Sequence, residues 1–172
     1  MRWIQFTLGA LAACGMGLGY VWLRGGQLPE SHRTQLTFRF DAPIERVWAV
    51  LSDFEGQPAW RSGLTGVNQA APGLWVEDYQ GTLMAMQTTA LESPHLLERR
   101  IADPDQPFQG FWRYQLSADG EGTLLTLSEE ASIHNPLYRF LAHGMSDFEQ
   151  TLRGLVADLE GPLGPAVEVT AP

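Results

Sequence analysis

The chain has 172 residues, enough for one domain with a sizeable core, and its 20 acidic and 11 basic residues give a formal net charge of −9. This acidity argues against nucleic acid as a partner, because binding to the phosphate backbone requires clustered positive charge. The chain has no lysine and a single cysteine, Cys14, which excludes a lysine Schiff base, an intrachain disulfide and a cysteine-based zinc site.

Residues 1–26 are expected to form an N-terminal transmembrane helix that anchors the chain in a membrane. The run 3–23 carries no charge, and as a helix it just spans a hydrocarbon core of about 30 Å. Aromatic residues lie at both ends of the run, where tryptophan and tyrosine are common at the membrane–water interfaces. These are Trp3 at one end and Tyr20 and Trp22 at the other. The sequence therefore predicts a single-pass protein of a bacterial inner membrane.

Two alternatives for this segment remain open. A cleaved secretory signal is one, although its apolar region is usually shorter, at about 7–15 residues. A lipoprotein signal is the other, since Leu11 to Cys14 resembles a lipobox, but the residues after Cys14 stay apolar. The cytoplasmic flank of a membrane helix usually carries more positive charge. Here Arg2 and the α-amine before the segment equal Arg24 and Arg33 after it, so the charges do not determine on which side the soluble domain lies. We slightly favour the extracytoplasmic side.

The rest of the chain divides into a linker at 27–33, a domain at 34–160 and a tail at 161–172. The linker shows no hydrophobic periodicity. The tail is rich in proline and glycine and has few large apolar residues, so it is predicted to be disordered.

The domain is expected to open with a strand followed by a helix. Alternation of Leu36, Phe38 and Phe40 with polar residues predicts a half-buried strand. Asp41 and Pro43 then mark a helix start. The apolar face of this helix is set by residues at helical spacing, namely Ile44, Val47, Trp48 and Leu51.

Residues 63–133 show the alternation of strands separated by turn residues. Short turns between consecutive strands predict an antiparallel meander. Six strands are expected, at roughly 64–70, 73–80, 82–92, 95–102, 111–118 and 123–134. Apolar residues at helical spacing then predict one C-terminal helix of about 24 residues, from Leu137 to Leu159.

This order of elements is that of the helix-grip plan, in which a curved sheet wraps around a long C-terminal helix. The segments 38–53 and 58–63, together with the C-terminal helix, resemble the SRPBCC, or START-like, polyketide cyclase/dehydrase superfamily. The resemblance implies an α+β fold with a curved, antiparallel, seven-stranded sheet around that helix. It leaves function open, since the superfamily includes lipid carriers, coenzyme Q-binding proteins, cyclases and hormone receptors.

A sheet curved around a helix leaves a mostly apolar cavity with a few polar groups, which suits a hydrophobic small molecule such as a lipid or a quinone. Trp60 and Arg61 lie in the turn after the first helices. Either they form a gate at the cavity mouth, or Trp60 fills the core and Arg61 faces solvent. The expected ligand-binding residues are Trp60, Trp75, Tyr79, Arg99, Trp112, Tyr114, Glu129, Met145, Phe148 and Leu152.

Glu129 is the candidate site residue of most interest, because it lies between Leu127 and Ala131 on a strand face predicted to be buried. A buried carboxylate needs a partner or a raised pKa, and Arg99 is the expected partner. A register shifted by one residue would instead turn Glu130 inward.

No HxxxH, HExxH, nucleophile elbow or phosphate loop occurs, so the sequence predicts neither a metal nor a cofactor. Three functions remain. The favoured one is a membrane-anchored domain that binds a hydrophobic small molecule. The second is a cyclase/dehydratase-like enzyme that uses Glu129, Tyr114 and Arg99 on a polyketide-like or aromatic substrate. The third is a protein-interaction module without a ligand.

Overall fold

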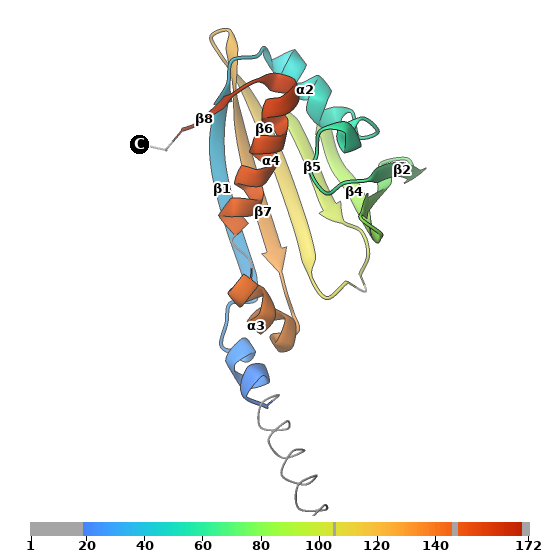
Figure 1. Cartoon of the computed structure of the whole chain (residues 1–172), viewed down its shortest axis with the longest axis vertical. Helices are drawn as coiled ribbons and strands as arrows, with labels where there is room; N and C mark the ends of the chain where they lie inside the picture. The colour runs from blue at the N-terminus through green and yellow to red at the C-terminus, as the bar shows by residue number, and fades with distance from the viewer. Residues whose placement is uncertain (1–18, 105, 146–147, 170–172) are drawn as a thin grey trace, which may run out of the picture.

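The structure, a computed structural model, describes residues 19–104, 106–145 and 148–169, without the side chains of residues 144–148. A helical stretch at 19–26 precedes an α+β domain built on a single antiparallel sheet (Figure 1). The sheet contains eight strands: β1 (Ser31–Phe40), β2 (Gly66–Ala71), β3 (Leu74–Tyr79), β4 (Thr82–Glu92), β5 (Leu96–Ile101), β6 (Gln109–Asp119), β7 (Gly122–Ser132) and β8 (Ala166–Glu168).

The predicted meander is confirmed, because β2 to β7 pair in chain order. The first strand then closes onto the last strand of the meander, so the full order is β2-β3-β4-β5-β6-β7-β1-β8. The strand boundaries agree with the expected ranges to within a few residues, since period-two alternation and turn residues are local signals.

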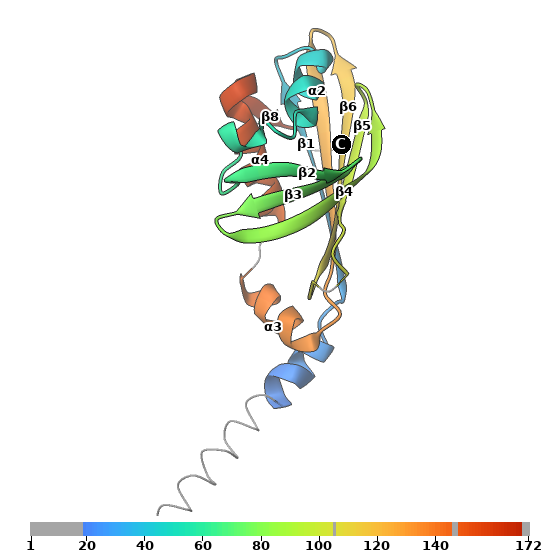
Figure 2. The same ribbon diagram turned by 90° about the vertical axis from the view of Figure 1, so that its right-hand side faces the viewer.

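Two helices cover the concave face of this sheet. These are α2 (Ile44–Ser52) and α4 (Phe148–Leu163), and a short 3-10 turn, η1 (Gln57–Ala59), follows α2. Figure 2 shows β2, β3 and β4 turning away from β6, β7 and β1 and wrapping towards α4. The sheet therefore grips the helix, as the resemblance implied.

The core lies between the concave face and the two helices. The predicted inward residues of the strands are buried, with Phe40, Leu125 and Leu127 at most 1% exposed. Val47 from α2 and Leu159 from α4 are fully buried against them. Burial of such large side chains contributes about 1.5–3 kcal/mol each, which makes this cluster the main source of stability.

The C-terminal helix differs from the prediction, because the apolar stripe is divided between α3 (Pro136–Met145) and α4. Arg139 of α3 is buried and binds the segment before β1, where it pairs with Glu30 at 3.1 Å and donates to the carbonyl of Leu28. Leu141, expected in the core stripe, is exposed instead. Helical periodicity predicts which residues share a face, but tertiary contacts decide what that face packs against.

The sheet has eight strands rather than the expected seven, because the tail adds β8 to the free edge of β1. The expectation of a disordered tail is therefore wrong for the part of the tail that the structure describes. Gly164 adopts a φ of +87° after α4, a conformation that glycine enters without steric cost, and this turn leads the chain back to β1. Three residues are too few to show an alternation pattern, so the sequence carried no signal for this strand.

Most of the predicted transmembrane segment lies outside the described residues. Within the described part of the chain, no helix is both long enough and apolar enough to cross a membrane. The linker expected at 27–33 is shorter than predicted, since β1 already begins at Ser31.

Candidate functional site

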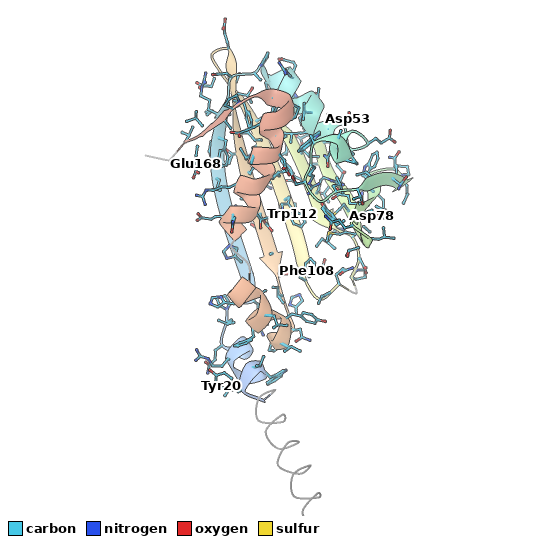
Figure 3. All side chains as sticks on the ribbon, viewed as in Figure 1. Tyr20, Asp53, Asp78, Phe108, Trp112 and Glu168 are labelled. Carbon is cyan, nitrogen blue, oxygen red and sulfur yellow. The ribbon has the colours of Figure 1, made fainter. Side chains whose placement is uncertain are left out.

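A pocket of about 600 Å³ lies between the inner face of β3 to β6 and α4. Its lining is mostly apolar, and polar groups are concentrated on β3 and β5 and in the segment after η1. Trp112 and Phe108, both labelled in Figure 3, belong to the lining. The complete set is Arg61, Ser62, Tyr79, Met84, Met86, Arg99, Phe108, Trp112, Tyr114, Thr151, Leu152, Gly154, Leu155, Ala157 and Asp158.

The polar end of the pocket is organised by Glu77, which is only 1% exposed. Its Oε1 forms an ion pair with Nη1 of Arg99. Its Oε2 accepts a hydrogen bond from the hydroxyl of Tyr79 at 2.6 Å and lies 3.2 Å from Nη1 of Arg61. Burial alone would raise the pKa of Glu77, but Arg99 and Arg61 together with these hydrogen bonds hold it below its ordinary value. Glu77 is therefore a carboxylate at neutral pH.

Arg99 has more hydrogen-bond donors than are used in the cluster that it forms with Glu77, Tyr79 and Arg61. The residue is 3% exposed, and its guanidinium stacks over the ring of Phe54 at 4.5 Å. Among the described residues, nothing accepts a hydrogen bond from its Nε or Nη2, although both atoms are buried. Buried donors without partners are rare in folded proteins, so each such group needs an explanation.

Arg61 links this cluster to the rim of the pocket. It donates to Gln57 at 3.1 Å and to Glu77 at 3.2 Å. The next residue, Ser62, donates its backbone N–H and its hydroxyl to Asp158 of α4, at 2.8 and 2.6 Å. The segment after η1 is thereby tied to both the sheet and α4.

Glu129 points to the concave side, as strand alternation predicted, and is 5% exposed. The neighbouring Glu130 faces outward and pairs with Arg33, so the shifted register is excluded. The expected partner is wrong, because Arg99 pairs with Glu77. Glu129 lies opposite Trp112, and its buried Oε2 has no hydrogen-bond partner among the described residues. Burial raises the pKa of Glu129 to about 7, and interaction with the Trp112 side chain opposes this rise only in part.

Five of the ten predicted site residues meet in the pocket, namely Tyr79, Arg99, Trp112, Tyr114 and Leu152. Trp75 packs against the core instead and contacts the ring of Phe54 at 4.9 Å. Trp60 also packs against the core, and it lines a second cavity of about 10 Å³ rather than the main pocket. Glu129 does not line the pocket, although Trp112 beside it does. The side chains of Met145 and Phe148 lie outside the described residues.

Glu77 is the residue that sequence reasoning missed. A signal for it was present, because Glu77 stands between Trp75 and Tyr79 at the spacing that places all three on one strand face. The contact between Glu77 and Arg99 had no comparable signal. These residues belong to β3 and β5, which are separated in the sheet by β4, so no strand-pairing rule brings them together.

The family of the chain follows from its match to a known family model. The model described as polyketide cyclase / dehydrase and lipid transport matches residues 31–160. The chain belongs to this family. The resemblance drawn from the segments 38–53 and 58–63 is thus confirmed, and the matched region covers the whole sheet except β8. No curated protein matches the chain.

Solved structures share the family fold at low sequence identity. A START superfamily protein from Mycobacterium smegmatis is 22% identical, with a TM-score of 0.62 over 77% of this chain and 97% of that one. The ZhuI aromatase/cyclase from Streptomyces sp. R1128 is 18% identical, with a TM-score of 0.58 over 78% of this chain and 92% of that one. The di-domain aromatase/cyclase BexL, from the BE-7585A biosynthetic pathway, is 11% identical, with a TM-score of 0.64 over 96% of this chain and 61% of that one. At these identities the likeness concerns the fold.

Proposed function

We propose that this protein binds a hydrophobic small molecule, such as a lipid or a quinone-like compound, in the pocket between the sheet and α4. The observation that carries the proposal is the pocket itself, which combines about 600 Å³ of mostly apolar space with a few convergent polar groups. Small-molecule sites have this size and composition. The family description, which includes both cyclases and lipid transport, is in keeping with it.

Gly154 offers a direct test, because it lines the pocket from α4 and a Cβ built on it meets no atom within 4 Å. Gly154→Phe should therefore place a ring in the pocket without a backbone clash. The helix should tolerate the change, since glycine is the poorer helix former. We expect the variant to fold normally but to lose binding of a fluorescent apolar probe, such as 1-pyrenebutanol, by about 10-fold or more.

Gly161 of the same helix provides the matched control, because it also meets no atom within 4 Å but does not line the pocket. Gly161→Phe should bind the probe as the unchanged protein does. If the unchanged protein binds no apolar probe and carries no small molecule in native mass spectrometry, the binding proposal fails. The interaction module without a ligand would then be the better description.

A second candidate function, a cyclase/dehydratase-like enzyme, is favoured by one observation. Glu129 is a buried carboxyl whose pKa is raised to about 7, and the neighbouring Trp112 lines the pocket. An acid that titrates near neutrality is suited to proton transfer. If the protein is an enzyme of this kind, Glu129→Gln should lower turnover by about 10²–10⁴-fold and leave binding intact. Retained turnover would exclude Glu129 as the acid or base.

We also propose that residues 1–26 anchor the protein in a bacterial inner membrane as a single-pass helix. The support is the uncharged run 3–23 with tryptophan and tyrosine at its ends. The full chain should remain in the membrane fraction after an alkaline wash. Recovery of soluble protein with an N-terminus at or beyond Cys14 would show a processed signal instead.

A further inference from the structure

We propose that the molecule bound in this pocket carries an acidic group, such as a carboxylate, which Arg99 and Arg61 bind at the polar end. The inference rests on the proposed binding function and adds the chemical class of the ligand. It is carried by the sharing of Glu77 between two arginines, by the unused donors of Arg99 and by a small cavity that Arg99 lines.

Arg99 shares its carboxylate partner, Glu77, with a second arginine, Arg61. The hydroxyl of Tyr79 donates to Glu77 and adds no charge. Buried donors without acceptors are costly, so the unused Nε and Nη2 of Arg99 favour a ligand that brings an acceptor, and an anion is the acceptor that binds a guanidinium most strongly.

In the part of the chain that the structure describes, Glu77 is the one acidic side chain that pairs with Arg99. Asp158, at the rim, acts electrostatically on Arg61 and accepts hydrogen bonds from Ser62 with both of its oxygens. Glu129 does not line the pocket, and burial favours its neutral form. Among the described residues, no further acidic side chain lines the pocket. An anion at Arg99 would therefore have to come from a ligand.

Arg99 has donors and space available for such a ligand. Its Nε and Nη2 are buried without an acceptor among the described residues. A second cavity of about 10 Å³ is lined by Gln57, Arg61, Arg99 and Tyr114, among others. It shares Arg61, Arg99, Tyr114 and Leu155 with the main pocket, and its volume suits a single oxygen-sized atom. An acid whose apolar body fills the main pocket could place one carboxylate oxygen there.

The test compares two probes that differ only in the head group. The full chain is titrated with 1-pyrenebutanoic acid and with 1-pyrenebutanol, and binding is followed by fluorescence and calorimetry. A charge-assisted hydrogen bond is worth about 10-fold or more in affinity, so the acid should bind at least about 10-fold more tightly than the alcohol. Equal affinities would overturn the inference, because a water molecule in the small cavity would then satisfy the donors of Arg99. The proposal that the pocket binds a hydrophobic molecule would still stand. Binding of neither probe would overturn both.

Three variants test whether the preference for the acid depends on Arg61, Arg99 and Glu77. Arg61→Gln should reduce the preference for the acid. Arg99→Lys should reduce it as well, because the single nitrogen of lysine cannot replace Nη1, Nη2 and Nε of Arg99 at once. Glu77→Gln should increase it, since both guanidinium groups are then free for the ligand. Arg100→Gln is the matched control, because Arg100 lies next to Arg99 on β5 but is exposed on the opposite face. A preference for the acid that persists in both arginine variants would contradict the assignment to this cluster.

Discussion

Trp112 and Glu129 lie directly opposite each other on β6 and β7, and burial raises the pKa of the Glu129 carboxyl group against the lowering effect of the Trp112 side chain. The pair connects the pocket to a buried acid, because Trp112 lines the pocket and Glu129 lies next to it on β7. Gly110 makes room for this arrangement, since a Cβ at that position would clash with the Trp112 ring. Two successive inward positions of β6 and the position opposite on β7 thus depend on one another through packing.

The first prediction concerns the dependence of stability on pH. The pKa of Glu129 is about 7 in the folded protein against an ordinary value of 4.5. Between these pH values the unfolded chain has released the proton and the folded chain still holds it. The contribution of Glu129 to stability is therefore full below pH 4.5 and is lost as pH rises through 7, by about 3 kcal/mol in total.

Glu129→Gln should remove this dependence, because glutamine does not titrate. The measurement is urea unfolding of both proteins at pH 4.5, 6 and 8, and the difference in unfolding free energy should shift in favour of the variant with rising pH. Glu130→Gln is the control, since Glu130 is exposed and adjacent. Parallel stability curves for the unchanged protein and Glu129→Gln would refute the raised pKa.

The second prediction concerns the ion pair between Glu77 and Arg99. Arg99→Leu leaves the buried carboxylate of Glu77 with Arg61 and Tyr79 as its remaining partners. Removing one member of a buried pair costs about 3–5 kcal/mol, and the remaining partners favour the lower end of that range. The loss should appear as a lower midpoint in urea unfolding.

Arg100→Leu is the control for that substitution, and we expect a change within about 0.5 kcal/mol because Arg100 is exposed. Replacing both Glu77 and Arg99 with leucine should restore part of the lost stability, since no unpaired carboxylate is then buried. A double variant that is less stable than Arg99→Leu alone would argue that Glu77 stabilises the fold mainly through Arg61 and Tyr79.

The third prediction concerns β8, which covers the free edge of β1. β8 pairs with Phe38 to Phe40, and the backbone N–H of Val169 donates to the carbonyl of Thr37 at 2.8 Å. A chain that ends at Gly164 exposes this edge, and an exposed edge strand can pair with another molecule. We expect concentration-dependent association of the shortened chain in light scattering.

A chain that ends at Val169 keeps β8 and serves as the control for this truncation. It should match the full chain in its state of association. If the chain that ends at Gly164 also matches the full chain at every concentration, β8 has no protective role at the edge of the sheet.

Local patterns in the sequence determined the strands, the first helix and the inward face of the sheet. Period-two alternation placed Glu129 on the same side as Leu125 and Leu127, and the structure buries all three. Such patterns succeed because the direction of a side chain follows from the backbone geometry of its own element. The family resemblance rests on the same segments, which explains why it fixed the fold class and left the function open.

Only the tertiary structure decided which polar side chains meet. Curvature of the sheet lets Arg99 of β5 reach Glu77 of β3 across β4, and η1 brings Arg61 to the same carboxylate. Arg139 likewise holds α3 against the segment before β1, a contact that helical periodicity does not predict. Ion pairs between distant segments leave no periodic trace in the sequence, because they depend on the path of the chain in space rather than on the conformation of any single element.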